Sequence, residues 1–163
     1  MYAFAYLDKS KKNEILPILF DLLYANMSLI APSNSSYETE RREFLTEVSS
    51  ALEKEPRKII LCYCKDELAG FLMYYTRGNL LMIEEIQLKK EYQKTMAFYR
   101  LCSFLATNLP EGIEQIESFV HKENVYSLSL QAKLGMKKID TENPKLYHLC
   151  GDAKIIRTRF ERG

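Results

Sequence analysis

The sequence has few of the residues that bind metal ions, and its charges nearly balance. Among its 163 residues there are two histidines and four cysteines, Cys62, Cys64, Cys102 and Cys150. Metal sites need more ligands than this pattern brings together, so we predict no metal and interpret the cysteines as reduced structural thiols. The balance of 23 Lys and Arg against 22 Asp and Glu lacks the positive field of a nucleic-acid-binding protein, and we predict no such partner.

The sequence also lacks a long apolar run and a leader-like N-terminus. Its longest apolar stretch, residues 68–75, is far shorter than the roughly 20 residues needed to span a bilayer. No basic segment followed by an apolar one opens the chain, so we expect a cytoplasmic protein without a membrane partner. The length and a hydrophobic content of 47% fit a single domain over residues 1–163, with a core at 3–150 and a basic tail at 151–163.

The first third of the chain reads as one strand and two helices. Residues 2–7 predict a strand, and Asn13 is expected to cap a helix with apolar side chains at helical spacing. The polar residues 31–37 predict a loop. A second amphipathic helix then follows and ends at Pro56.

The remainder predicts an antiparallel meander followed by alternating helices and strands. Residues 58–64, 68–75 and 80–88 form three apolar runs separated by turns, and the middle run lacks alternation, as expected for a strand covered on both faces. A helix from 96 to 108, a strand at 113–120, a helix capped by Asn124 and ended by Gly135, and a hairpin from 136 to 150 complete the core. The tail is left open as an extra strand, a dimer contact or a disordered segment.

This order predicts an α/β fold with a mixed, mostly antiparallel central sheet of about seven strands and helices on both faces. The strand–helix–strand unit in the middle requires one parallel pair of strands, with its helix crossing one face of the sheet.

Two stretches of the sequence resemble the GNAT superfamily of acyl-CoA N-acyltransferases. Residues 82–88, MIEEIQL, followed by KKEYQ, are similar to the family's fourth strand and the start of its pyrophosphate loop. Residues 124–136, NVYSLSLQAKLGM, are similar to its asparagine, helix and Lys-x-Gly signature. The resemblance implies that the fourth and fifth strands are parallel and splay apart. It also implies acetyl transfer from acetyl-CoA, or another acyl-CoA, to a primary amine of a small cationic or peptide substrate by direct attack.

The resemblance places the cofactor at a loop that opens a helix directly after a strand. Such a helix start offers N–H groups to the pyrophosphate. The expected contacts are the loop residues and the backbone of the fourth strand, together with the capping asparagine: Gln93, Lys94, Thr95, Met96, Ala97, Phe98, Ile86, Leu88 and Asn124. The family carries small residues where this sequence has Met96 and Phe98. The Phe98 ring therefore points either into the core, which preserves the site, or into the cleft, which obstructs it.

The candidate catalytic residues are Glu84, Glu85 and Tyr126. Adjacent residues of a strand point to opposite faces, so we expect the two carboxylates to separate, each with a pKa raised by apolar neighbours. The resemblance makes Glu84 the base and Glu85 an anchor for a substrate cation. Alternatively, both carboxylates pair with Lys or Arg on a neighbouring strand.

Gln131 stands where the family often carries a tyrosine that protonates the leaving thiolate. Tyr126 is then a substitute acid, or a tyrosine that only packs. The loop from Met27 to Tyr37 is expected to line the acceptor pocket.

Two other interpretations stay open. One is a catalytically inactive GNAT-fold module that binds acyl-CoA or a protein, and the other is a plain α/β scaffold whose motif matches arise by chance. These residues do not decide whether the chain forms a homodimer.

Overall fold

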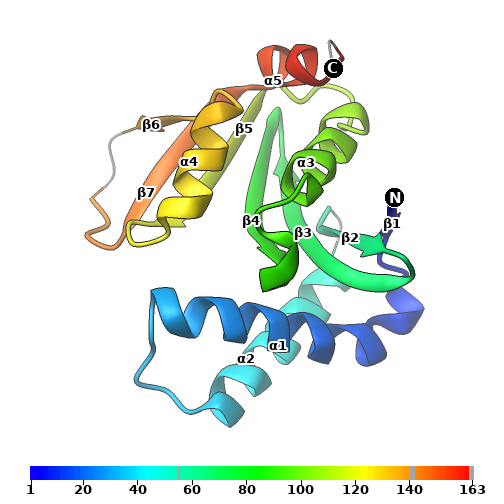
Figure 1. The fold of residues 1–163 in the computed structure, drawn as a ribbon, viewed down its shortest axis with the longest axis vertical. Coiled ribbons are helices and arrows are strands. Elements are labelled where there is room, and N and C mark those ends of the chain that lie inside the picture. The colour runs from blue at the N-terminus through cyan, green and yellow to red at the C-terminus, as the bar shows by residue number, and fades with distance from the viewer. Residues whose placement is uncertain (55, 140–141, 162–163) are drawn as a thin grey trace.

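A computed structural model describes residues 1–54, 56–139 and 142–161. Its centre is a seven-stranded sheet in the order β1-β2-β3-β4-β5-β7-β6 (Figure 1). All neighbouring strands are antiparallel except β4 and β5, which are parallel. The predicted mixed α/β fold is therefore confirmed.

The strands and helices follow the predicted order along the chain. The strands are β1 (Tyr2–Tyr6), β2 (Lys58–Cys64), β3 (Glu67–Arg77), β4 (Leu80–Leu88), β5 (Gln115–His121), β6 (Lys137–Ile139) and β7 (Leu146–Asp152). The helices are α1 (Lys12–Ile30), α2 (Tyr37–Glu53), α3 (Ala97–Thr107), α4 (Val125–Lys133) and α5 (Ala153–Glu161), with short 3-10 turns at Lys9–Lys11 and Lys90–Tyr92. Within these described residues, no helix is long and apolar enough to cross a membrane.

Helices cover both faces of the sheet, and each face has its own buried cluster (Figure 1). The larger cluster lies between the sheet and α3, α4 and α5, and the smaller one lies between the sheet and α1 and α2. Strand β3 contributes alternate side chains to the two clusters: Leu72 and Tyr74 to the larger, and Phe71 and Met73 to the smaller. The absence of alternation in this run therefore did indicate a strand buried on both sides.

The first helix begins differently from the prediction. Asn13 lies inside α1, which starts at Lys12 and is preceded by the 3-10 turn. The Asp8 carboxylate caps that turn by accepting from the Ser10 N–H at 2.9 Å. The capping role of Asn13 is therefore wrong, because an aspartate five residues earlier already starts the helical segment.

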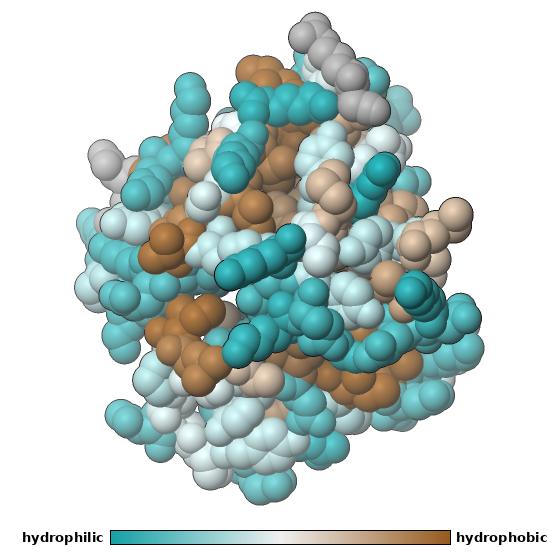
Figure 2. All heavy atoms as spheres, in the orientation of Figure 1, coloured by the Kyte–Doolittle hydropathy of each residue, from teal (hydrophilic) through white to brown (hydrophobic). Residues whose placement is uncertain are grey.

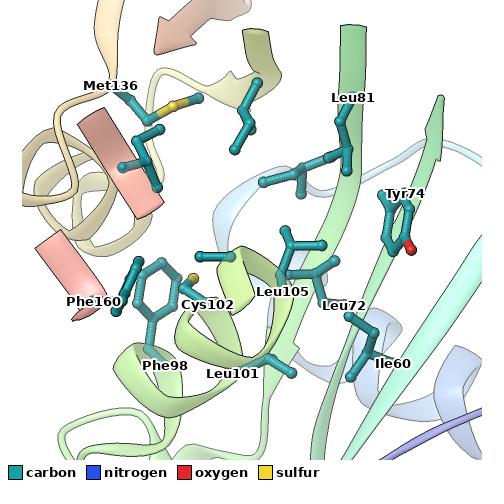
Figure 3. Close-up of a cluster of buried hydrophobic side chains, with 14 of the residues drawn as sticks. Ile60, Leu72, Tyr74, Leu81, Phe98, Leu101, Cys102, Leu105, Met136 and Phe160 are labelled. Carbon is teal, nitrogen blue, oxygen red and sulfur yellow. The ribbon is translucent and has the colours of Figure 1, made fainter. Parts of the chain in front are cut away.

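The basic tail folds as α5, which none of the three open alternatives anticipated. Ala153, Ile156 and Phe160 are buried in the larger cluster, and the rings of Tyr99 and Phe160 lie 4.9 Å apart. Figure 3 shows Phe160 beside Phe98 of α3. The Arg159 guanidinium donates to the Lys133 carbonyl at 2.5 Å, which ties α5 to the end of α4. This last helix therefore helps to hold α3 and α4 on the sheet.

Candidate active site

The parallel pair separates halfway along its length. Paired residues run from Leu80 opposite Gln115 to Ile83 opposite Ser118, whereas the two strands continue to Leu88 and His121. Beyond the Ile83 pairing, β4 keeps its hydrogen bonds only with β3. The predicted splay of the fourth and fifth strands is therefore confirmed.

A β-bulge at Glu84 changes which way the two carboxylates point. Met73 lies opposite Glu85 and Tyr74 lies opposite Ile83, so Glu84 is an extra residue in β4. A bulge interrupts the alternation of side chains between the two faces. Glu84 and Glu85 consequently line the same cavity, and the prediction that they point to opposite faces is wrong.

Glu84 forms an ion pair with Arg57, the residue before β2. Its carboxylate lies 2.6 Å from the guanidinium, and both side chains are mostly buried. Arg57 also lies 5.3 Å from the centre of the Tyr75 ring. Burial raises the pKa of Glu84, while the charge and hydrogen bond of Arg57 lower it. Glu84 therefore pairs with a basic residue, although Arg57 precedes β2 and does not lie on a strand next to β4, as the alternative expected.

Glu85 has no such cation. Its carboxylate accepts a hydrogen bond from the Gln87 amide at 2.9 Å, and no ion pair involving it is present among the described residues. Burial raises the pKa of Glu85 from 4.5 to about 7, because the charged form loses hydration, and the nearby Glu84 adds to the effect. This carboxyl group therefore exchanges its proton near neutral pH.

The gap between the splayed strands is a cavity of about 290 Å³, which we call the splay cavity. Its walls are β4, β5 and α4, with contributions from α1 and β7: Met27, Ile83, Glu84, Glu85, Ile86, Gln87, Ser118, Phe119, Val120, His121, Asn124, Ser127, Gln131 and Leu146. Ser118 donates to Gln131 at 2.5 Å, and Gln131 donates to Ser127 at 3.0 Å. Since Ser118 and Gln131 are buried, this chain of hydrogen bonds joins α4 to β5 where the strands begin to part.

A second cavity, about 310 Å³, lies under the end of α1, and we call it the loop cavity. It is lined by Phe20, Leu23, Tyr24, Met27, Ser28, Ala31, Pro32, Ser33, Glu40 and Glu85. Met27 and Glu85 line both the loop cavity and the splay cavity. The segment from Met27 to Ser33 thus lines a pocket beside the acidic pair, in the region where the acceptor loop was expected.

A third, smaller cavity of about 70 Å³, which we call the helix cavity, lies between α1, the end of β4 and the start of α4. It contains many of the predicted cofactor residues and is lined by Asn26, Ile30, Ile86, Gln87, Leu88, Gln93, Phe98, Asn124, Tyr126 and Ser127. Figure 2 shows a hollow on the molecular surface between α1 and α4. The structure thus brings Ile86, Leu88, Gln93, Phe98, Asn124 and Tyr126 together, whereas Lys94, Thr95, Met96 and Ala97 do not line this cavity.

The start of α3 keeps amide groups available despite its large side chains. The Ala97 N–H donates to the Thr95 hydroxyl at 3.1 Å. Helix geometry leaves the next N–H groups without intrahelical acceptors, and those of Phe98 and Tyr99 have no acceptor among the described residues. The Met96 side chain is 53% exposed, so it extends into solvent.

The Phe98 ring points into the core. Its side chain is 5% exposed and belongs to the larger cluster with Leu101 and Phe160 (Figure 3). Of the two orientations considered for this ring, the structure shows the one that leaves the helix start open.

The backbone of β4 faces the gap at Ile86 and Leu88. The Lys89 N–H donates to the Ala69 carbonyl at 2.8 Å, so the neighbouring residue Leu88 directs its backbone groups away from β3. Side chains already occupy the Leu88 carbonyl, which accepts from Asn26 at 2.9 Å and from Gln93 at 3.2 Å. The groups left for a ligand at this edge are the Leu88 N–H and the backbone of Ile86.

Asn124 and Tyr126 lie at the start of α4. The Asn124 side chain accepts from the Ser127 N–H at 3.2 Å, which confirms it as the cap of this helix. The Tyr126 side chain is 37% exposed, and partial burial raises its pKa. Its side chain lines the helix cavity rather than the splay cavity.

Sequence reasoning missed three polar residues of this region. Asn26 bridges Gln87 and Leu88, with the amide of Asn26 donating to Gln87 at 3.0 Å, and Ser118 meets Gln131 across the gap. A signal for each was present, because Asn26 lies in a mostly apolar stretch of α1, Gln87 stands between Ile86 and Leu88, and Ser118 alternates with Ile116 and Val120. A polar residue at a core position usually has a buried partner.

Solved structures of known proteins share this fold. The PaiA N-acetyltransferase from Thermoplasma acidophilum in complex with coenzyme A is 16% identical, with a TM-score of 0.73, over 93% of this chain and 99% of that one. An acetyltransferase from Thermus thermophilus is 15% identical, with a TM-score of 0.75, over 93% and 97%. The chain has the GNAT fold.

A third solved structure is also similar to this chain, whereas comparison of the sequence alone finds no match. The ribosomal-protein-S18-alanine N-acetyltransferase from Escherichia coli is 13% identical, with a TM-score of 0.67, over 94% of each chain. The amino-acid sequence matches no family model and no curated protein. The GNAT fold is therefore evident from the arrangement of the strands rather than from the sequence as a whole.

Proposed function

We propose that this protein is an N-acetyltransferase that moves an acetyl group from acetyl-CoA to a primary amine of a small cationic substrate. The observation that carries the proposal is the position of Glu85. This mostly buried carboxyl group lines both the splay cavity and the loop cavity, and its pKa is about 7. A proton acceptor with such a pKa at the junction of two cavities is suited to an amine on one side and a thioester on the other.

The proposed cofactor site runs from the splay to the start of α3. The backbone of Ile86 and the Leu88 N–H pair with the pantetheine arm as an added strand would. The free N–H groups of Phe98 and Tyr99 face the pyrophosphate, where the partial positive charge of the helix start favours an anion. Asn124 contacts the arm from the opposite wall of the helix cavity. Coenzyme A in the Thermoplasma structure supports this choice of ligand.

Glu85, rather than Glu84, is the proposed base. Glu85 accepts a proton from the ammonium group of the acceptor, which leaves a neutral amine next to the thioester. The amine nitrogen then forms a bond to the acetyl carbon, the carbon–sulfur bond breaks, and the sulfur leaves as a thiolate. The nitrogen releases its second proton to give the amide, and this proton replaces the one that Tyr126 gives to the thiolate. Because Arg57 neutralises Glu84, that carboxylate positions Arg57 and the bulge instead of exchanging protons.

Tyr126 is the proposed proton donor to the departing thiolate. It is the titratable side chain that lines the helix cavity, and its raised pKa keeps the phenol protonated at neutral pH. A thiolate with a cysteine-like pKa of ~8.5 leaves readily. Loss of the phenol is therefore expected to slow turnover without abolishing it.

Binding and turnover measured together test the proposal. Acetyl-CoA at about a hundred times its dissociation constant should stabilise the fold by roughly 2.7 kcal/mol in thermal unfolding. Thiol release that depends on added amine should accompany the binding. Absence of any thermal shift at millimolar acetyl-CoA and CoA would contradict the proposal.

A second candidate function is an acyl-CoA sensor without catalysis. It is favoured by Gln131, which is buried and hydrogen-bonded where the family often has a catalytic tyrosine. A thermal shift with acetyl-CoA, without thiol release for any amine in a broad panel, would select the sensor over the enzyme.

A further inference from the structure

The loop cavity carries more negative charge than the reaction itself needs. Two carboxylates line it, Glu85 from β4 and Glu40 from α2, and no Lys or Arg is among its lining residues. Glu85 is the proposed base. Glu40 has no part in the proton transfer, so its presence in the same cavity calls for a separate explanation.

Glu40 is a partly buried carboxylate without a cationic partner. No ion pair or side-chain hydrogen bond involves it among the described residues, although Glu84, on the same side of the sheet, is neutralised by Arg57. A partly buried charge is costly unless a partner compensates it. Solvent compensates exposed glutamates of the same helix such as Glu38, but Glu40 lines a cavity of about 310 Å³.

The wall between the two carboxylates is apolar and aromatic. Helix α1 contributes Phe20, Leu23, Tyr24 and Met27 to it. The Phe20 and Tyr24 rings lie 5.8 Å apart, and Phe20 is buried, so this wall is fixed by packing. Such a surface suits methylene groups, and the aromatic faces also attract a cation.

We infer that the acceptor is an amine with a second cationic group, joined to the first by a short apolar chain, and that Glu40 binds this second cation. The inference rests on the proposed function for the role of Glu85. The primary amine that is acetylated lies at Glu85, and the methylene chain follows the wall of α1. Glu40 thereby selects diamines over monoamines without taking part in the chemistry.

Kinetics with two matched amines test this selection. With acetyl-CoA saturating, kcat/KM is compared for 1,4-diaminobutane and 1-aminobutane, which share one chain length and differ in the second ammonium group. We expect the wild-type protein to favour the diamine by about tenfold or more, as for one charge-assisted contact. Glu40→Gln should remove that preference by raising KM of the diamine, and should change kcat/KM for the monoamine by a much smaller factor. Glu38→Gln, which changes an exposed glutamate of the same helix, is the control and should keep the preference.

The outcomes separate this inference from the proposed function. Equal kcat/KM for the two amines, or an equal loss for both in Glu40→Gln, would overturn the role of Glu40 while acetyl transfer stands. Binding of each amine is also measured by calorimetry, with no acetyl-CoA present. If neither these two amines nor any amine of the broad panel is acetylated, the proposed function fails. Tighter binding of the diamine that Glu40→Gln abolishes would still support the cation site, and equal binding would refute it.

Discussion

The two halves of β4 differ in how they are paired and in the side chains that they carry. From Leu80 to Ile83 the strand is paired on both sides, and Leu81 and Ile83 are buried in the larger cluster. From Glu84 to Leu88 it is paired only with β3, and it carries Glu84, Glu85 and Gln87. The change occurs at the bulge.

The difference shows how the fold places a carboxyl group inside the molecule and beside a cavity. Residues in the first half gain stability from full pairing and apolar burial. Residues in the second half have lost one neighbouring strand, and the space it leaves is the splay cavity. A carboxyl group there is shielded from bulk water by the sheet and α1 but is still reached through the cavity.

The largest expected effect is a loss of activity on substitution of Glu85, in the half of β4 that is paired only with β3. Glu85→Gln should lower kcat by about a hundredfold or more, since general bases contribute roughly 10² to 10⁴. In the wild-type protein kcat should rise with pH and inflect near the Glu85 pKa of about 7, and the variant should lack this inflection. Steady-state rates across the pH range check the expectation, and acetyl-CoA affinity serves as the control because it should not change. An unchanged pH profile in the variant would remove Glu85 as the base.

A core substitution in the fully paired half of β4 should reduce the stability of the fold. Leu81 is fully buried, so Leu81→Ala should reduce the free energy of unfolding by about 2–5 kcal/mol through lost contacts and a cavity. Ile86 is only partly buried beside the gap, and Ile86→Ala should cost less. Denaturant unfolding of both variants measures the difference. Equal losses would mean that the gap is as tightly packed as the paired half.

The stability cost of Glu85 should depend on pH. Because its pKa in the folded protein is raised from 4.5 to about 7, the folded state binds more protons between these values than the unfolded state does. The contribution of Glu85 to the free energy of unfolding is therefore fully present below its unfolded-state pKa of 4.5 and is lost as the pH rises through about 7. Glu85→Gln should be more stable than wild type near pH 8, by at most roughly 3 kcal/mol, and similar to it near pH 4. Denaturant unfolding at the two pH values tests this, and a difference that does not vary with pH would contradict it.

The smallest effect is expected at the neighbouring carboxylate. Glu84→Gln removes the charge that Arg57 pairs with, and should reduce the free energy of unfolding by roughly 1 kcal/mol, as for a partly buried ion pair. It should lower kcat by less than about tenfold, because the proton transfer does not pass through it. Parallel rate and unfolding measurements on Glu84→Gln and Glu85→Gln decide which carboxylate acts as the base.

Most of the fold was predictable because its signals are local and repeated. The apolar run from 68 to 75, the cap at Asn124 and the turn residue Gly135, whose φ is +97°, each occur in the structure as expected. The C-terminal helix was missed although Ala153, Ile156 and Phe160 have helical spacing, because the basic residues between them were interpreted as a tail.

The site was less predictable because its key features are not local. The bulge at Glu84 depends on how β3 pairs with β4, and no residue type indicates it. The contrast between Glu84 and Glu85 depends on Arg57, which lies far away in the sequence. The orientation of Phe98 depends on the core around Phe160, at the other end of the chain. The sequence did predict the acidic pair, the splay of β4 and β5, and several residues that line the helix cavity, because these depend on the order of the elements.

The extra residue at Glu84 also changes which side chains of β4 face α3, those with odd or those with even residue numbers. Before it, odd-numbered side chains such as Leu81 and Ile83 face α3, and after it even-numbered ones, Ile86 and Leu88, do so. In a saturation mutagenesis map of this strand, polar substitutions should therefore be better tolerated at even-numbered positions before residue 84. After residue 84 they should be better tolerated at odd-numbered positions. Deleting that one residue would merge the frames into a regular alternation, in which Glu85 keeps its face of the sheet and stands there without a second carboxylate beside it.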